Sequence, residues 1–222
     1  MGLSYDILIA DDHPLFRSAL RQALAAGLGE SVTLNEVGSI EGLQAQLATR
    51  SQWDLVLLDL NMPGAYGFSG LAQLRGQFPH IPVIMISAQE ESSVARRAKD
   101  FGASGFIPKS ATLEAIQASV QAVLEGGVCW PDGLDDPQGM TSEQQDISTR
   151  VASLTPQQFR VLTMVCDGLL NKQIAYELDV SEATIKAHVT AIFRKLGVHS
   201  RTQAVLAIGS LSVELPQNLA VP

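Results

Sequence analysis

The sequence has few of the features that mark secreted, zinc-binding or membrane proteins. Only two cysteines, Cys129 and Cys166, occur among 222 residues, and their spacing fits neither a disulfide framework nor a zinc site. No apolar run approaches the roughly 18 to 20 residues that a membrane span needs, and the N-terminus has no secretory signal pattern. We therefore expect a cytoplasmic protein in a reducing compartment, without a membrane partner.

The chain also lacks an overall positive charge, since its formal net charge is −8. A uniformly basic nucleic-acid binder is thereby excluded. The acidic excess is uneven, however: residues 1–125 carry net −5, residues 126–150 carry −4 and residues 151–222 carry +1. The C-terminal segment can therefore meet an anion if its cations share a face.

What is present is enough apolar sequence for a core, because 46% of the residues are hydrophobic. Short apolar runs alternate with amphipathic stretches over residues 1–125. Strands are predicted at residues 5–10, 32–37, 55–58, 83–86 and 105–107, and helices after Pro14 and near 40–48, 68–77, 92–101 and 112–125. This alternation predicts a doubly wound, five-stranded parallel sheet with helices on both faces, an α/β fold of the flavodoxin-like kind.

Polar residues follow four of these strands. Asp11 and Asp12 follow the first, Asp59 the third, Ser87 the fourth and Lys109 the fifth. Strand ends of a parallel sheet meet at one edge, where ligands bind. Clustered carboxylates repel one another unless a hard cation shares them, and oxygen ligands suit Mg²⁺. A lysine and a hydroxyl beside them can hold phosphoryl oxygens, so Asp59 is the natural acceptor of a phosphoryl group.

A strand-end aspartate can also serve only to cap the next helix. The combination at four strand ends favours a site instead. The stretches that carry this combination resemble a two-component receiver domain over its full length: Ile9-Ala10-Asp11-Asp12-His13-Pro14, Leu57-Leu58-Asp59-Leu60-Asn61-Met62-Pro63-Gly64, Met85-Ile86-Ser87-Ala88 and Phe106-Ile107-Pro108-Lys109-Ser110.

The resemblance implies that Asp59 accepts the phosphoryl group from a sensor histidine kinase. It further implies that Asp11, Asp12, Asp59 and the backbone carbonyl of Asn61 position Mg²⁺. Many receivers have a proline after the conserved lysine, whereas this chain has a serine there.

The resemblance also assigns roles to three further residues. Ser87 and Lys109 would bind the phosphoryl oxygens, and Phe106 would take the place of the aromatic switch residue. Phe106 could also be an ordinary core aromatic. For His13, a place at the start of a helix beside the site is favoured over a catalytic role.

Residues 126–150 are predicted to be a flexible acidic linker. Gly126 and Gly127 end the last helix of the first domain, which we place at residues 1–125. The stretch that follows contains prolines, glycines and five acidic residues without apolar periodicity. Its acids are expected to act as a solvated spacer, with repulsion of DNA or contact with a basic face as alternatives.

The last segment is expected to be all helical over residues 151–213, followed by a tail at 214–222. Thr155, Asn171, Ser181 and Ser200 are predicted to cap four successive helices, the first of which ends before Gly168. The second and third helices are joined by a tight turn. This is the layout of a small helix-turn-helix domain.

The third of these helices is expected to enter the major groove of DNA. An apolar stripe recurs along one face, at Ile185, Val189, Ile192 and Leu196. Other faces carry candidates for base or phosphate contacts, together with cations on the neighbouring helices. The DNA-binding candidates are Lys172, Lys186, Ala187, Thr190, Arg194 and Arg201, with Lys195 as a further phosphate candidate.

This segment is similar to the C-terminal domain of LuxR/NarL-type regulators over about 60 residues. The similarity lies in Leu154-Thr155-Pro156, Gly168-Leu169-Leu170-Asn171-Lys172-Gln173-Ile174-Ala175, Val180-Ser181-Glu182-Ala183-Thr184-Ile185-Lys186-Ala187-His188-Val189 and Lys195-Leu196-Gly197-Val198. Gln158 stands where the family usually has a glutamate. Thr190 stands where some members have a basic residue.

Together the two resemblances imply a phosphorylation-controlled, DNA-binding transcriptional regulator that is not an enzyme. Its expected partners are a sensor histidine kinase, a double-stranded DNA operator, RNA polymerase and, when phosphorylated, a second copy of itself. A phosphatase with Asp59 as nucleophile is disfavoured because Asn61 stands where that chemistry needs a second aspartate. The remaining alternative is a constitutive DNA binder whose receiver serves only as a scaffold.

Overall fold

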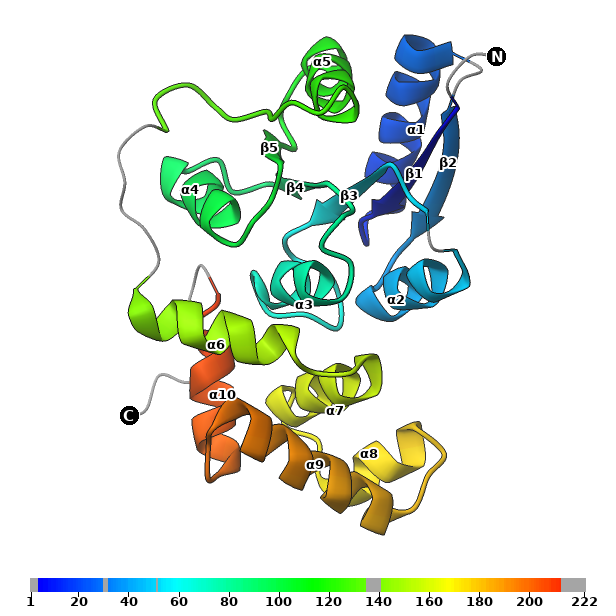
Figure 1. The fold of residues 1–222 in the computed structure, drawn as a ribbon. Coiled ribbons are helices and arrows are strands. Elements are labelled where there is room, and N and C mark those ends of the chain that lie inside the picture. Colours follow the sequence, from blue (N-terminus) through cyan, green and yellow to red (C-terminus); the bar gives the residue numbers. More distant parts are fainter. Residues whose placement is uncertain (1–3, 30–31, 51, 135–140, 213–222) are drawn as a thin grey trace. The chain divides into compact units, whose positions relative to one another are not determined.

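The computed structural model describes residues 4–29, 32–50, 52–134 and 141–212 (Figure 1). By their contacts these residues form two compact units. One contains the described residues up to Pro63 and from Phe78 to Leu134, and the other contains Gly64–Gln77 and residues 141–212. The predicted tail at 214–222 lies outside the described ranges.

A five-stranded parallel sheet forms the centre of the first unit. The strand order is β2-β1-β3-β4-β5, and all four pairings are parallel. The strands are β1 (Tyr5–Ala10), β2 (Val32–Val37), β3 (Leu55–Asp59), β4 (Val83–Ser87) and β5 (Gly105–Pro108). The order turns back at β1, so that the carboxyl ends of β1 and β3 lie side by side at the switch point.

Helices follow the strands as the alternation predicts. They are α1 (Pro14–Leu28), α2 (Ile40–Thr49), α3 (Ser69–Gln77), α4 (Ser92–Asp100) and α5 (Leu113–Leu124). Figure 1 shows α1 and α5 on one side of the sheet and α2 on the other. The predicted doubly wound α/β fold is therefore confirmed, and the stated boundaries of its strands and helices differ from the expected ones by at most one residue.

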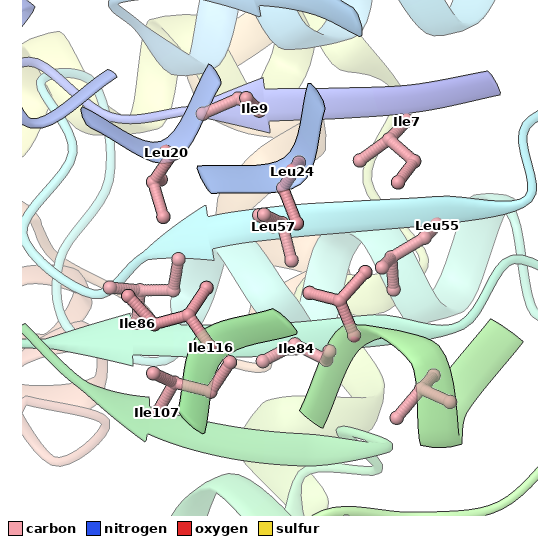
Figure 2. Packing of buried hydrophobic residues seen from close by; sticks show 12 residues of the cluster. Ile7, Ile9, Leu20, Leu24, Leu55, Leu57, Ile84, Ile86, Ile107 and Ile116 are labelled. Carbon is pink, nitrogen blue, oxygen red and sulfur yellow. The ribbon is translucent and has the colours of Figure 1, made fainter. Parts of the chain in front are cut away.

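Alternate strand positions build the core beneath α1 and α5 (Figure 2). Leucines of α1 and branched side chains of α5 pack onto side chains that the strands direct to this face. The cluster comprises Ile7, Ile9, Leu20, Leu24, Leu55, Leu57, Ile84, Ile86, Ile107, Ile116, Val120 and Val123. Residues of β3 and β4 are buried along the whole length of both strands. Side chains packed on both faces of the sheet therefore hold the carboxyl ends of these strands in place.

The chain after α5 returns to the edge of the sheet. Cys129 forms a parallel bridge with Gly105, accepting a hydrogen bond from the Phe106 N–H (2.9 Å) and donating one to the Ser104 carbonyl (3.1 Å). The Lys99 Nζ lies over the indole ring of Trp130, 5.8 Å from the ring centroid. This part of the predicted linker is therefore attached to the edge of the sheet, and residues 135–140 lie outside the described ranges.

The second unit includes five helices between residues 142 and 209, namely α6 (Ser142–Ala152), α7 (Pro156–Cys166), α8 (Asn171–Glu177), α9 (Glu182–Leu196) and α10 (Arg201–Gly209). Helix α9 contacts α6, α7 and α8, and α10 contacts α7. The predicted all-helical domain with a helix-turn-helix is confirmed, its two helices being α8 and α9.

Two local expectations in this region are wrong. Helix α6 occupies residues that were expected to be irregular, because Thr141 and Gln144 form a complete capping box and Ile147 and Val151 bury one face. Asn171 does not cap α8 but is its first residue. The Gln173 side chain instead accepts from the Leu170 N–H at 2.7 Å, which stabilises this helix start.

Candidate functional site

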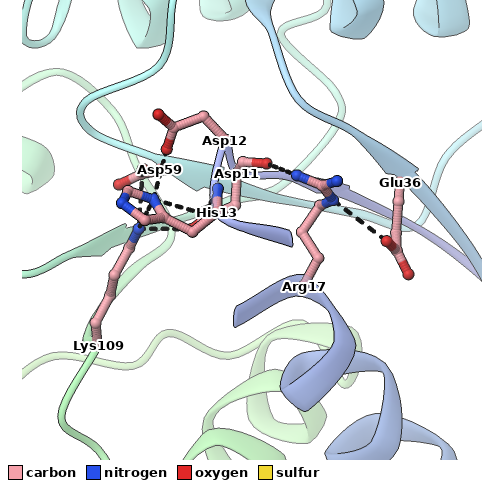
Figure 3. Close-up of polar contacts among 7 residues, drawn as sticks. All are labelled: Asp11, Asp12, His13, Arg17, Glu36, Asp59 and Lys109. Carbon is pink, nitrogen blue, oxygen red and sulfur yellow. Dashed lines mark hydrogen bonds and ion pairs between the residues drawn. The ribbon is translucent and has the colours of Figure 1, made fainter. Parts of the chain in front are cut away.

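Three carboxylates meet at the carboxyl edge of the sheet, as the strand ends predict (Figure 3). Asp11 follows β1 and Asp59 ends β3, and both are buried, with 1% and 3% exposure. Among the described residues, one ligand atom from each of Asp11, Asp12, His13 and Asp59 lies within 4.8 Å of the others. Hard oxygen donors at this spacing fit a divalent cation such as Mg²⁺.

Lys109 joins the two buried carboxylates. Its Nζ lies 2.7 Å from Asp11 Oδ2 and donates a hydrogen bond to Asp59 Oδ2 at 3.0 Å. Burial lowers the pKa of Lys109, but its contacts with these carboxylates outweigh that effect and raise the pKa above its ordinary value. Lys109 therefore stays charged and faces the phosphoryl acceptor predicted from the sequence.

The pKa of Asp59 is raised above its ordinary value. Burial is the largest cause and the charge of Asp11 adds to it, whereas Lys109 and a backbone hydrogen bond from Asn61 act in the opposite direction. The same bond places the backbone of Asn61 next to Asp59. The structure therefore brings together the whole carboxylate set and the backbone segment predicted for a cation.

Ser87 lies at the end of β4 and is fully buried. Its Oγ accepts a hydrogen bond from the Gln89 N–H at 3.0 Å, so its hydroxyl hydrogen can be donated to another acceptor. The Ser87 carbonyl accepts from the Lys109 N–H at 2.7 Å, which holds the ends of β4 and β5 together. Phe106, on β5, is buried and directs its N–H to Cys129.

His13 contacts the site in addition to standing directly before α1. It precedes α1 without capping it through its side chain, and its Nδ1 lies 2.6 Å from Asp12 Oδ1 and 3.4 Å from Lys109 Nζ. The side chain is 65% exposed. The only sequence signal for this position is its place directly after the two aspartates.

Helix α9 has the two faces that the sequence predicts. Ile185, Ile192 and Leu196 are buried. Another face forms an open hollow lined by Lys186, Ala187, Thr190, Ala191 and Arg194. Lys186 also forms an ion pair with Glu182 one turn earlier, at 3.0 Å. Four of the predicted DNA-binding residues thus share one face of this helix.

The other predicted cations differ in whether they form hydrogen bonds within the protein. Lys172 is exposed at the start of α8. Lys195 donates to the Ser153 carbonyl (2.7 Å) and to Gln158 Oε1 (2.8 Å). Arg201 Nη2 donates to the Val165 carbonyl near the end of α7, at 2.5 Å. Lys195 and Arg201 therefore take part in packing between helices, a role that sequence reasoning did not anticipate.

Fold and site together define a receiver domain joined to a helix-turn-helix DNA-binding domain. The family model of the response regulator receiver domain matches residues 7–121, and that of bacterial regulatory proteins of the luxR family matches residues 152–208. The chain belongs to the response regulators with a luxR-type DNA-binding domain, and is a two-component transcription factor.

Known proteins are similar to this protein over nearly its whole length. A "Glycerol metabolism activator" of Pseudomonas putida is 40% identical over 213 residues, covering 93% of this chain and 96% of that protein. The "Nitrate/nitrite response regulator protein NarP" of Escherichia coli is 33% identical, covering 91% and 93%. The structure of Salmonella typhimurium RcsB has a TM-score of 0.55 at 21% identity, covering 92% and 98%, and thus shares the fold. Within the described ranges, no helix has the length and apolar character that crossing a membrane requires.

Proposed function

We propose that Asp59 accepts a phosphoryl group from the phosphohistidine of a sensor kinase, and that this reaction controls dimerisation and DNA binding. The observation that carries the proposal is the position of Lys109 Nζ, which contacts both Asp59 and Asp11. A partly buried lysine between two buried carboxylates provides a fixed positive charge where phosphoryl oxygens would gather.

In this proposal an oxygen of Asp59 forms the bond to phosphorus while the bond from phosphorus to the kinase histidine nitrogen breaks. Lys109 neutralises charge on a phosphoryl oxygen. Ser87 donates its hydroxyl hydrogen to another, since its Oγ already accepts from the Gln89 N–H. After transfer, these two residues contact oxygens that are missing from the resting state, and Phe106 is proposed to respond as the switch aromatic.

Asp11, Asp12, Asp59 and the Asn61 carbonyl are the proposed ligands of Mg²⁺. When bound, the ion would neutralise negative charge on the transferring phosphoryl group. The donor set supports this assignment because its carboxylate oxygens are clustered and two of its members are buried.

The direct test is intact mass spectrometry of the full chain after incubation with acetyl phosphate and Mg²⁺. One phosphoryl group should be added to the natural protein, none to Asp59→Asn, and none when a chelator removes the metal. A phosphoryl group retained by Asp59→Asn would show that the acceptor is a different residue.

The second part of the proposal concerns DNA. We propose that α9 enters the major groove through Lys186, Ala187, Thr190 and Arg194, while Lys172 and Arg201 approach phosphates. Because residues 151–222 carry only net +1, one copy should bind weakly, and two copies on half-sites about 10 bp apart should supply useful affinity.

RNA polymerase is the proposed further partner, since the Pseudomonas putida relative is named as an activator. A constitutive binder with an inert receiver is the competing function. The two are distinguished by measuring operator affinity of the full chain before and after phosphorylation. Equal dissociation constants and equal oligomeric states in both forms would favour the constitutive binder.

A further inference from the structure

Arg17 lies on the first turn of α1, beside the carboxylate cluster but outside it (Figure 3). Its Nη1 donates a 2.6 Å hydrogen bond to the backbone carbonyl of Asp11, and its Nε donates to Glu36 Oε2 at 3.3 Å. The side chains of Arg17 and Glu36 are each 19% exposed. The guanidinium therefore connects the end of β1 to a carboxylate on β2.

These contacts fix the peptide that carries the first two aspartates. The Asp11 N–H donates to the Val37 carbonyl of β2 at 3.1 Å, so this backbone group is already held by the neighbouring strand. The Asp11 carbonyl has left the strand pairing and is held by Arg17 instead. With both polar groups of Asp11 bound, its backbone orientation is set, and so is the direction in which Asp12 departs.

The side chain of Asp11 is oriented within the same loop. Its Oδ1 accepts from the His13 N–H at 2.8 Å, which leaves Oδ2 directed toward Lys109. Gly38, which follows β2, borders the guanidinium, since a Cβ there would lie 3.5 Å from Arg17 Nη1, in ordinary van der Waals contact. Rotation of the Asp11 peptide would move both carboxylates, so the fixed carbonyl matters to any cation that they share.

As a charge alone, Arg17 would be unfavourable here, because a cation near a divalent metal site lowers metal affinity. Glu36 compensates part of that charge. Geometry and charge therefore make opposite predictions for removal of the side chain. Loss of a repelling charge would tighten Mg²⁺ binding, whereas loss of a support for the loop would weaken it.

We propose that Arg17 is a positioning residue for the metal site, holding the Asp11 carbonyl so that the carboxylates of Asp11 and Asp12 converge on the cation, with Glu36 holding the guanidinium in turn. This inference rests on the proposed Mg²⁺ site and assigns it a support outside the ligands. Residues that orient metal ligands typically change metal affinity by about 10- to 100-fold when they are removed.

Arg21 provides a matched control on the same helix. It donates through Nε to Glu36 Oε1 at 2.5 Å, and no bond from Arg21 to the Asp11 carbonyl occurs in the part of the chain that is described. Arg21→Ala therefore removes the same charge and one Glu36 ion pair, but leaves the loop support intact.

The experiment is a calorimetric titration of the full-length chain with MgCl₂ for the natural protein, Arg17→Ala and Arg21→Ala. We expect Arg17→Ala to raise the Mg²⁺ dissociation constant about tenfold, and Arg21→Ala to change it by less than about twofold. Unchanged or tighter binding by Arg17→Ala, or equal weakening in both variants, would overturn the proposal.

A second measurement separates positioning from loss of folding. The rate of phosphorylation by acetyl phosphate is followed against Mg²⁺ concentration. Arg17→Ala should need about tenfold more Mg²⁺ for half-maximal rate but reach nearly the natural maximum. Arg17→Lys keeps a donor but lacks the forked guanidinium that bonds both the Asp11 carbonyl and Glu36. Its Mg²⁺ concentration for half-maximal rate should therefore lie between those of the natural protein and Arg17→Ala. A lower maximum at an unchanged Mg²⁺ requirement would contradict positioning.

The natural protein serves as the reference for the proposed function itself. If it binds no Mg²⁺ in the titration, the proposed metal site fails regardless of Arg17. If it binds Mg²⁺ and Arg17→Ala binds equally well, the metal site stands and only the role of Arg17 is wrong.

Discussion

Lys109 Nζ lies 3.0 Å from Asp59 Oδ2, and yet the pKa of Asp59 is raised. Burial is the dominant cause, and together with the charge of Asp11 it outweighs the lowering of the pKa by Lys109 and by the backbone hydrogen bond from Asn61. The negatively charged form of Asp59 is therefore disfavoured by the fold. A phosphoryl acceptor and a cation ligand both require this charge, so the site is built for function at the expense of stability.

Asp59→Asn should raise the free energy of unfolding at pH 7 in the absence of Mg²⁺. Because the folded pKa of Asp59 lies above its unfolded value of about 4, the stability contributed by this group is present below that value and is lost as pH rises through the folded pKa. The neutral amide avoids that loss. We expect a gain of about 1 kcal/mol at pH 7, narrowing toward pH 4.

Urea unfolding of both proteins between pH 8 and pH 4 measures this difference. Asp132→Asn, at an exposed aspartate, is the control and should show no comparable gain. A variant at Asp59 that is less stable than the natural protein at pH 7 would contradict the prediction.

Gly105→Ala should displace the strand-like segment at Cys129. A Cβ at Gly105 would lie 2.1 Å from Cys129 Sγ and 2.8 Å from the Cys129 carbonyl oxygen, so the returning chain must move. We expect destabilisation of about 1–3 kcal/mol. Cys129→Ala in the same background removes the sulfur from the clash and should recover part of the loss.

Thiol labelling reports the same displacement. Burial raises the pKa of Cys129 to about 11, so at pH 8 the folded protein should react slowly at this thiol. Labelling of Cys129 should accelerate in Gly105→Ala. Cys166, whose pKa burial raises to about 12, should stay slow in both proteins, and equal labelling rates of Cys129 would refute the displacement.

Lys186→Ala should weaken binding to an operator selected from random DNA by roughly 1–3 kcal/mol if Lys186 reads a base. The matched variant Glu182→Gln removes its ion-pair partner at 3.0 Å and leaves the lysine in place. Binding by Glu182→Gln should be unchanged or tighter. Competition binding at fixed salt measures both, and an unchanged dissociation constant for Lys186→Ala would remove this residue from base readout.

Arg194→Ala should weaken DNA binding alone, whereas Arg201→Ala should also lower the stability of the fold. Arg194 is exposed on α9, so its loss should lower the slope of log affinity against log salt by about 1 with little change in stability. Arg201 donates to the Val165 carbonyl, so its loss should destabilise the protein by about 1–3 kcal/mol. Thermal unfolding and salt-dependent binding of both variants test this, and equal stability of the two would show that the Arg201 bond contributes little.

Local sequence patterns determined the strands, most of the helix starts and the residues at the strand ends. The apolar runs that end before Asp11 and at Asp59 are too short to form helices. A proline or a capping residue stands at the start of helices such as α1 and α7. Parallel pairing then brings strand ends together by topology. The candidate cluster could therefore be predicted without coordinates.

The linker shows where such reasoning fails. The capping box and the two buried apolar residues of α6 can be found in the sequence. Two apolar residues are a weak helical periodicity, however, and the acidic residues around them favour a linker instead. The bridge at Cys129 has no local signal, since pairing with β5 depends on which sheet edge the chain meets.

The sequence by itself determined which chemical groups gather at the sheet edge and on α9, because these positions follow from periodicities of two and 3.6 residues. Only the tertiary structure decided which polar groups support others. Arg17 and Glu36 are 19 residues apart, and Arg201 reaches a carbonyl 36 residues away. A long side chain has many possible partners in an unfolded chain, and packing alone selects one of them.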